Sequence, residues 1–577
     1  MNERKALLGF FLMGLVGCIQ PFSHPKQEPV VEKKKEIEVK TIGKVASVEN
    51  TSDVEVFGIG LVVGLDGTGG GAPPGPYRSV LEDQLPKENK IENVKQFLAS
   101  NTTSLVLVSA RIPAGARKDD IIDINISLPR ESRTTSLRGG RLLRCHLYDY
   151  STKKGISPNY KGIDVAVRGK PVARAEGNVS VGFGDGDEQS RLRAGRIWGG
   201  GICAMGRPLY LIMNPDSTSA SITSKCAERI NETFHGIGPG ASTDLASAQD
   251  KRVVLINVPP QYKLNLPHFI RVVRLVPLYQ SAEADRIAYM RQLEEQLLDP
   301  ARSIPAALRL EALGPDSVPT LKHGMTSEHP LVRFTSAEAL AYLGNASCGE
   351  ELGKIAREQP ALRAFSLAAL ASLDESVSHV ELRNLLSQSS AETRYGAFRA
   401  LHSLDEHDEA IRGEKLNESF WLHRVATESS PMVHLATTRA AEVVIFGEEP
   451  LMIPPFPILA GEFTVTAKAG DDRCTITHAS LRSGKTQKQC SLKLEEVIRT
   501  MAQMGALYPD VVELLRRADA LQCLSCKVAV DAVPQEVSSV YDLAKAAAGD
   551  AELLKTHPEI LAAKAEFGAS PTLFQQT

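Results

Sequence analysis

A repeated helical pattern between residues 296 and 446 constrains the fold of this chain more than any other feature. Glycine becomes rare here, alanine and leucine become frequent, and three segments align with one another, at 332–343, 362–373 and 393–404. The second position of each segment is an arginine, so that Arg333, Arg363 and Arg394 recur about every 30 residues. Helix pairs repeated in this way stack and bury a continuous core. The pattern therefore predicts an α-solenoid that folds on its own, with 433–446 as a degenerate last unit.

The repeats resemble the short HEAT-like repeat of bacteria, in which an arginine stands near the start of the second helix. This resemblance implies a concave face that binds a protein partner of unknown identity. The alternative is a spacer that only adds bulk. Partner binding is favoured because such arrays rarely carry chemistry.

Length and composition bound the remaining possibilities. A chain of 577 residues is too long for one core, so about three or four domains are expected. A net charge of −3 gives no field that would attract nucleic acid, and an aromatic content of 5% argues against base-stacking surfaces. Hydrolase and zinc-protease motifs are absent, and Asp185 and Asp187 lack the other ligands of a calcium loop. We therefore expect no catalytic residues, no metal, no cofactor and no nucleic-acid partner, and we predict that the chain is not an enzyme.

The first 18 residues have the pattern of a secretory signal. Arg4 and Lys5 precede a short apolar run at 6–16, which ends in Leu-Val-Gly-Cys at 15–18. That ending resembles the lipobox of bacterial lipoproteins, so we predict that residues 1–18 are a signal peptide and that Cys18 carries the lipid. A chance cysteine after a plain signal is the alternative. Residues 19–40, rich in Pro, Lys and Glu, are expected to be a flexible tether to the membrane.

Residues 41 to 290 alternate short apolar strands with glycine-rich turns. The runs at 105–108, 121–126 and 253–256 predict strands, and the apolar spacing of 219–234 predicts a helix. Five runs then occur in the order in which flagellar P-ring proteins carry them. They lie at 57–69, 109–117, 136–143 (Ser-Leu-Arg-Gly-Gly-Arg-Leu-Leu), 175–182 and 214–231. One such run would be weak evidence, but five in order over about 240 residues indicate that this region resembles the P-ring family.

The glycines of the first run are positions of the family motif. These are Gly58, Gly60, Gly64, Gly67 and Gly69. Glycine permits turns and close backbone approach, so we expect turns and tight contacts between strands here. A phosphate-binding loop is the alternative, but the spacing G-x-G-x-x-G is missing and no G-K-[ST] follows.

Residues 447 to 533 return to strands, at 463–466 and 474–477, and continue with two helices, at 494–504 and from Pro509 onward. A last strand at 526–530 completes an order similar to the closing segment of P-ring proteins. The fold is therefore predicted as α+β, with strand-rich P-ring-like modules interrupted by the inserted helical array. The run at 479–486 fits a permissive nucleotide-binding pattern, but we interpret it as a hairpin turn, with nucleotide binding as the lesser alternative. Residues 534–577 are expected to form an Ala-rich helical tail.

Eight cysteines remain besides Cys18, and their spacing cannot fix a pairing. The C-x-x-C at 523–526 lacks the context of a redox or zinc site. We interpret the cysteines as small buried residues. A disulfide between Cys474 and Cys490, which flank the expected hairpin, is the second interpretation.

The resemblance implies a structural function. It implies a subunit of a homo-oligomeric periplasmic ring around the flagellar rod, with rod and L-ring proteins as partners. Lipid on Cys18 would add attachment to a membrane, expected to be the outer one. The alternative is an envelope lipoprotein outside any flagellum whose array recruits a partner, because typical P-ring proteins have neither a lipid anchor nor a helical array.

The run at 136–140 supplies candidates for ring assembly. Rings need one surface patch to meet a different patch on the next subunit. Arg138 could offer its planar donor fork to a neighbour's carboxylate or carbonyls, while Gly139 and Gly140 permit close approach. The alternative is an ordinary surface charge beside a turn.

Overall fold

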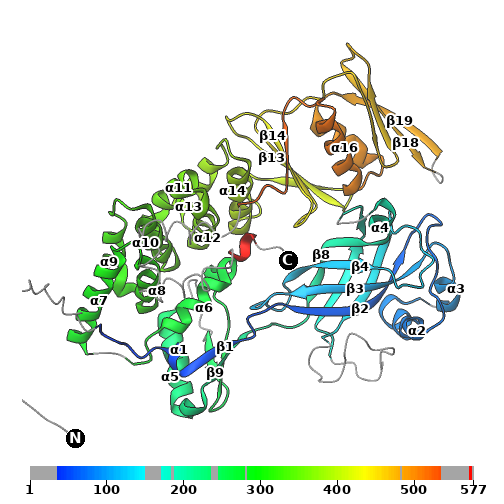
Figure 1. Cartoon of the computed structure of the whole chain (residues 1–577). Helices are drawn as coiled ribbons and strands as arrows, with labels where there is room; N and C mark the ends of the chain where they lie inside the picture. The colour runs from blue at the N-terminus through cyan, green and yellow to red at the C-terminus, as the bar shows by residue number, and fades with distance from the viewer. Residues whose placement is uncertain are drawn as a thin grey trace, which may run out of the picture. The chain divides into compact units, whose positions relative to one another are not determined.

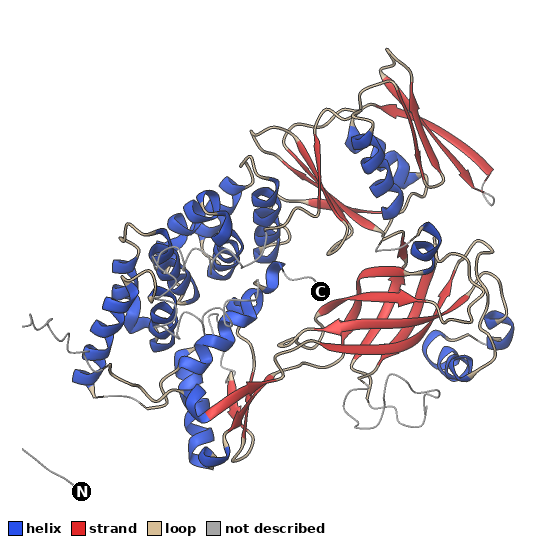
Figure 2. Cartoon of the chain, in the orientation of Figure 1, coloured by secondary structure: helices blue, strands red, loops and turns tan. Residues whose placement is uncertain are grey.

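The computed structural model describes residues 36–91, 93–149, 170–183, 187–234, 245–279, 282–480, 484–534 and 571–574. Cys18, the predicted signal peptide, Asp185 and most of the expected tether and tail lie outside the described residues. Strands and helices both contribute extensively, so the predicted α+β class is confirmed (Figures 1 and 2). Across the described ranges, every helix is too short or too polar to cross a membrane.

An antiparallel barrel forms between residues 54 and 203. Its strands are β2 (Val54–Val63), β3 (Ser104–Ile112), β4 (Ile121–Ser127), β5 (Arg141–Leu147), β6 (Ala173–Asn178), β7 (Ser180–Val181) and β8 (Gly195–Cys203). The sheet order is β4-β3-β2-β5-β6-β8-β7, and β4 also pairs with β8, so the sheet closes on itself. Closure satisfies the backbone groups that a sheet edge would leave open. Helices α2 (Pro76–Asn89) and α3 (Val94–Leu98) pack outside, over β2 and β5.

A second sheet comes before the helical array in the sequence and shares a core with it. It has the antiparallel order β1-β9-β11-β10, with β1 (Ala46–Glu49), β9 (Leu209–Met213), β10 (Ala246–Ala248) and β11 (Val253–Ile256). Three helices cover it, namely α1 (Ile42–Val45), α5 (Ala220–Thr233) and α6 (Leu266–Leu275). The predicted strand at 253–256 and the predicted helix at 219–234 are thus confirmed as β11 and α5.

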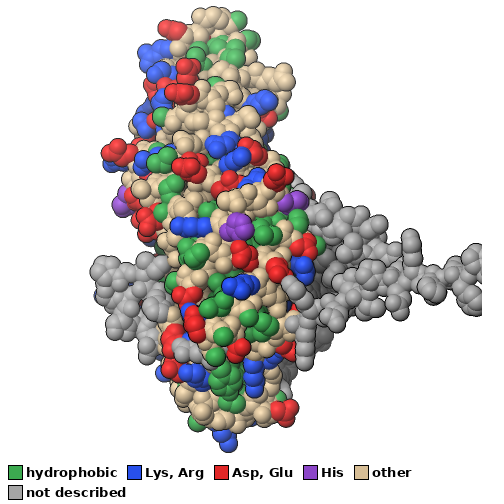
Figure 3. Space-filling view, turned by 90° about the vertical axis from the view of Figure 1, so that its left-hand side faces the viewer, with side chains coloured by type: hydrophobic (Ala, Val, Ile, Leu, Met, Phe, Trp, Pro, Cys, Tyr) green, Lys and Arg blue, Asp and Glu red, His purple; other side chains and the backbone are tan. Residues whose placement is uncertain are grey.

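The repeats form two layers of helices. The first helix is α7 (Glu283–Leu297), and it is followed by α8 (Ser303–Leu313), α9 (Val318–Gly324), α10 (Pro330–Tyr342), α11 (Gly349–Glu358), α12 (Arg363–Leu373), α13 (Ser376–Leu385) and α14 (Ala391–Leu404). Helices α8, α10, α12 and α14 contact one another in sequence order and form the inner layer. Helices α9, α11 and α13 pack against them and form the outer layer. Figure 3 shows basic, acidic and apolar side chains interspersed over the face that it presents, without a field of one sign.

The recurring arginines connect successive repeats. Each stands in the first turn of an inner helix, as predicted. Arg333 Nε lies 2.6 Å from a carboxylate oxygen of Glu351, and Arg363 Nη1 lies 3.4 Å from one of Glu392. Arg394 closes the series by donating through Nη1 to the carbonyl of Ser430, 2.8 Å away. The repeat in the sequence therefore corresponds to a repeated charge-assisted contact that fixes how each unit stacks on the next.

The helical array ends earlier than predicted. Residues 433–446, expected to be a last helical unit, form strands β14 (Met432–Ala436) and β15 (Glu442–Phe446) and the loop between them. Every residue of both strands is buried, because Val444 and Phe446 face the core of the array whereas Val443 and Ile445 face the next core. A short apolar run buried on both faces has no period that separates strand from helix, which explains the wrong prediction.

The C-terminal module, residues 413–530, contains two sheets and two helices. One sheet has the order β12-β13-β15-β14-β20 and the other β16-β17-β18-β19. The further elements are β12 (Gly413–Leu416), β13 (Phe420–Val425), β16 (Phe456–Ala460), β17 (Phe463–Ala467), β18 (Arg473–Ser480), β19 (Gly484–Ser491), α15 (Leu494–Gln503), α16 (Tyr508–Ala520) and β20 (Lys527–Val530). The predicted strands and helices of 463–530 are confirmed. Residues 481–483 of the run at 479–486 lie outside the described residues, but β18 and β19 pair as a hairpin on either side of them, so the hairpin interpretation is confirmed. Gly484 onward is strand β19 rather than a helix, which does not fit a nucleotide loop.

The inner layer of the array packs on the preceding segment of the chain. The 3-10 helix η2 (Pro260–Asn265) contacts α12, and α6 contacts α8. The Tyr262 ring stacks on Tyr342 of α10 with centroids 4.8 Å apart, and its hydroxyl donates to Glu311 of α8 over 2.7 Å. Array and preceding sheet share one apolar core. This packing argues against the expectation that the array folds on its own.

Candidate functional site

The turn at 136–140 is built by local contacts before it reaches anything else. Leu137 is fully buried, and its backbone N–H donates to the carbonyl of Leu192 over 2.9 Å. Gly139 has a φ of +72°, and a Cβ on Gly140 would overlap with the side chains of Val62 and Leu65. Both glycines are therefore required for the turn that leads into β5.

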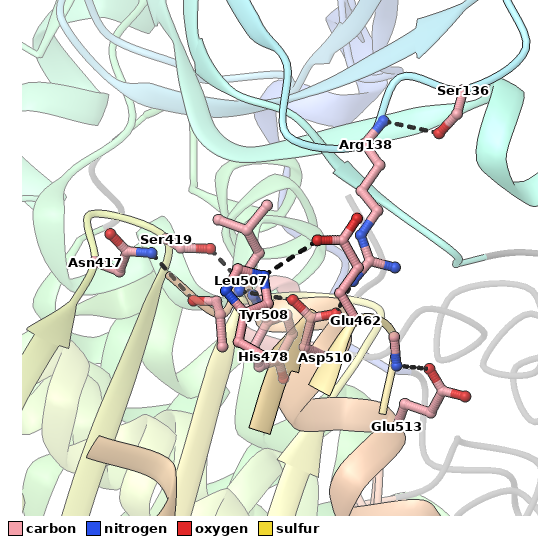
Figure 4. A network of polar contacts seen from close by, with 12 residues as sticks. Ser136, Arg138, Asn417, Ser419, Glu462, His478, Leu507, Tyr508, Asp510 and Glu513 are labelled. Carbon is pink, nitrogen blue, oxygen red and sulfur yellow. Dashed lines mark hydrogen bonds and ion pairs between the residues drawn. The ribbon is translucent and has the colours of Figure 1, made fainter. Parts of the chain in front are cut away.

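Arg138 extends from this turn to the C-terminal module (Figure 4). Its Nη2 forms an ion pair with Oδ1 of Asp510, which lies 372 positions further along the chain. The Asp510 side chain is only 4% exposed, whereas that of Arg138 is 30% exposed. The sequence-based hypothesis directed Arg138 toward a neighbouring subunit, but in this structure the guanidinium binds a carboxylate of its own chain.

Asp510 holds the start of helix α16 as well as the arginine. Its Oδ2 accepts from the backbone N–H of Leu507 at 2.9 Å, one of the donors that a helix start leaves unpaired. The Tyr508 N–H donates to Ser419 Oγ over 3.2 Å, and Asn417 Nδ2 donates to the carbonyl of Ala506 over 3.1 Å. The orientation of α16 is thereby coupled to both β12–β13 and the barrel.

Gly461 leaves the space that this ion pair occupies, and the sequence did not reveal this role. It lies in the turn between β16 and β17 with a φ of +60°, and a Cβ there would overlap with Arg138 and Asp510. Its backbone N–H donates to Glu513 Oε2 over 2.9 Å. The residues next to Gly461 give no sign of this role. The space for a side chain at Gly461 is limited by Arg138, which belongs to the barrel.

Aromatic contacts add to the Arg138–Asp510 ion pair in connecting the barrel to the C-terminal module. This contact region is called the joint below. Tyr508 is fully buried, and its ring lies 5.6 Å from Trp198 of β8, edge to face, and 5.9 Å from Phe183. Nearby, Arg196 Nη1 of β8 donates to the carbonyl of Thr438 over 2.5 Å. Buried aromatic pairs of this geometry stabilise an interface beyond the area that they cover. The joint therefore connects the barrel to the C-terminal module through packing and charge together.

Burial sets the electrostatics of the joint. Removal of water raises the pKa of Asp510, and the charge of Arg138 acts in the opposite direction. Arg138 therefore offsets part of the cost of burying the Asp510 carboxylate. Chemically, this arrangement can fix one module on another.

The motif glycines lie in the barrel and its rim. Gly58 and Gly60 are inside β2, where a Cβ would overlap with the His146 carbonyl or the Leu142 side chain of β5. Gly64, Gly67 and Gly69 follow β2, and Gly69 approaches the Thr103 carbonyl closely. These positions agree with the expected turns and tight contacts between strands. In the part of the chain that the structure describes, no three His, Cys, Asp or Glu side chains are grouped to hold a metal ion.

The fold and this joint define a class of protein, a chain of several modules connected by packing and charge. Comparison with known proteins makes the class specific. A family model described as flagellar P-ring protein matches residues 41–291, close to the region that the motifs delimited. The flagellar P-ring protein of Thermotoga maritima is 30% identical over 257 residues, which cover 42% of this chain and 68% of that protein. The chain belongs to the flagellar P-ring protein family.

Other relatives give the same result with lower coverage. The flagellar P-ring protein of Nitratidesulfovibrio vulgaris is 30% identical over 260 residues, covering 43% of this chain and 61% of the relative. That of Escherichia fergusonii is 28% identical over 238 residues, covering 39% and 58%. The chain thus spans between 58% and 68% of the length of these three relatives.

Proposed function

We propose that this protein is a structural subunit of a periplasmic ring around the flagellar rod, assembled from identical copies and in contact with rod and L-ring proteins. The observation that carries the proposal is the family membership over residues 41–291. The joint adds support, because the arginine of the Ser-Leu-Arg-Gly-Gly run forms an ion pair with the C-terminal helix that resembles the family's closing segment. We further propose that lipid on Cys18 attaches the subunit to the outer membrane through the tether of residues 19–40.

The joint gives Arg138 an indirect role in assembly. A closed ring requires that the two patches of each subunit stand at a fixed angle, because any error in that angle is repeated at every interface. Arg138, with Gly139 and Gly140 shaping its turn, fixes the angle between barrel and C-terminal module. Arg138 is therefore a positioning residue in this proposal, and the patches that meet between subunits lie elsewhere.

The helical array favours a second candidate function, in which an envelope lipoprotein outside the flagellum recruits a partner. The P-ring family model ends at residue 291, within α7, so most of the HEAT-like array lies beyond it. Because η2 and α6 cover part of the inner layer, we place the partner-binding surface on the outer layer of α9, α11 and α13 in either function.

Electron microscopy of basal bodies extracted in detergent from the native host tests the first function. Closed rings around the rod that bind an antibody against the array are expected. Label confined to the envelope away from basal bodies, with rods surrounded by unlabelled rings, would contradict the flagellar role and favour the second function. Sedimentation of the purified chain provides the second measurement, since closed oligomers of uniform size are expected.

A further inference from the structure

The base of the β18–β19 hairpin holds two facing cysteines. Cys474 and Cys490 occupy directly opposite positions in the antiparallel ladder, and their sulfurs lie 3.4 Å apart. Their exposed fractions are 0% and 1%. Among the eight cysteines of the described residues, this is the one pair whose sulfurs are in contact.

A disulfide between these cysteines would lie at the base of an exposed edge strand. Strand β19 is the edge of its sheet, and its residues from Gly484 to Gln489 are exposed. Only the ladder to β18 and the packing at the base hold this strand, since Cys490 is the buried residue where β19 meets the core that α15 also contacts. A covalent link at the base would therefore restrain the whole exposed strand.

We propose that Cys474 and Cys490 form a structural disulfide that fixes the β18–β19 hairpin, made by exchange with a disulfide carrier. The Cys490 thiolate attacks the carrier's disulfide, whose sulfur–sulfur bond breaks and releases one carrier thiolate. Cys474 then loses its proton to solvent, and its thiolate displaces the second carrier thiolate from Cys490. Two cysteine thiols are oxidised by two electrons, and one carrier disulfide is reduced to two thiols.

The local chemistry fits this order of attack. Hydrogen bonding with Cys474 lowers the pKa of Cys490, and the same contact together with burial raises that of Cys474. Cys490 is therefore the sulfur that reacts first, as thiolate. Because both sulfurs are buried in the folded chain, the exchange takes place once β18 and β19 have paired and the two thiols are in contact, but before the core closes over them.

Disulfides persist only in oxidising compartments, so in the cell the proposal rests on the export that is part of the proposed function. The decisive experiment tests the disulfide separately from the proposed export. The full chain is reduced, unfolded, and refolded with oxidised and reduced glutathione, and free thiols are trapped with N-ethylmaleimide before peptide mapping by mass spectrometry. A linked peptide pair containing Cys474 and Cys490 is expected, with Cys523 and Cys526 carrying label. Label on both Cys474 and Cys490 would overturn the disulfide.

Hydrogen exchange of the refolded chain tests the structural role. The chain refolded in dithiothreitol, in which both thiols stay free, should exchange its β19 amides about tenfold faster than the chain refolded with the bond. The matched variant Cys523→Ala/Cys526→Ala should respond like the natural chain, whereas Cys474→Ala/Cys490→Ala should not respond. Equal exchange with and without reductant in the natural chain would overturn the role. If the refolded chain carries the bond and the chain trapped in its native host carries free thiols at both positions, the export proposal is wrong and the hairpin geometry stands.

Discussion

Single residues fix the connection between the barrel and the C-terminal module. Asp510 is nearly buried, caps α16 and binds Arg138, while Gly461 leaves the space that both side chains occupy. An isolated buried carboxylate is costly, and removing one partner of such a pair leaves the other uncompensated. The importance of Arg138 therefore follows from where Asp510 lies.

A double-mutant cycle on this pair gives the first prediction. Arg138→Gln should lower the free energy of unfolding by about 2 kcal/mol at pH 7, because Asp510 stays charged without its partner. Asp510→Asn should cost less, and the double variant should lose at least about 1 kcal/mol less than the sum of the two single losses. Denaturant unfolding at matched concentrations measures the cycle. Additive losses would show that the two side chains do not interact.

The same variant should depend on pH in a defined direction. Burial raises the folded-state pKa of Asp510 above its ordinary 3.8, and the loss of Arg138 raises this pKa further. The folded Arg138→Gln chain then binds more protons than the unfolded chain, so its stability falls as pH rises from 3.8 through the folded-state pKa. The destabilisation caused by Arg138→Gln should thus be larger at pH 7 than near pH 4. An equal loss at both pH values would contradict a role through Asp510.

Elements are stabilised here by surfaces that other parts of the chain supply. The carboxylate of Glu311 in α8 lies 2.7 Å from His268 Nε2 in α6 and accepts from Tyr262 in η2. Glu338 of α10 is fully buried nearby, and burial raises its pKa. Polar groups enclosed in this way are stable only while their partners remain in place. The array consequently depends on η2 and α6 at its inner layer.

Fragments of the chain test this dependence. A fragment 296–404 should show a helical circular-dichroism spectrum but a broad melt, because its inner layer exposes Glu311, Tyr342 and their apolar neighbours. A fragment 257–404, which retains η2 and α6, should melt more sharply and bind less hydrophobic dye. A cooperative melt of the shorter fragment, equal to that of the longer one, would show that the repeats fold without the inner contact.

At the scale of the whole molecule, attachment and assembly are separate properties. The predicted anchor is Cys18, which lies outside the described residues, whereas the described modules supply the surfaces from which a ring would be built. Intact mass of the mature protein should show a lipid-modified N-terminus at Cys18. Cys18→Ser should move the protein from the membrane fraction to the soluble periplasmic fraction while the purified chain retains its oligomer size. Unchanged membrane fractionation of the variant would contradict the anchor.

The sequence alone determined the local structure and the family. Apolar residues recur every 2 residues along a half-buried strand and every 3.6 residues along an amphipathic helix. This pattern predicted the strands of 105–126, the helices of 332–404 and the closing helices of 494–520. The ordered runs between residues 57 and 231 identified the family, and the arginine repeat identified the array. These signals are all contained within short stretches of chain.

Tertiary structure decided everything that joins distant stretches. The partner of Arg138 lies 372 positions away, and Gly461 is constrained by a side chain of the barrel, so neither has a local signal. Residues 433–446 became strands because cores on both of their faces bury alternate side chains. The inner layer of the array was covered by η2 and α6, although the repeat pattern predicts a free surface there. In each case the deciding free energy comes from burial against another module, and that contact exists only once the chain has folded.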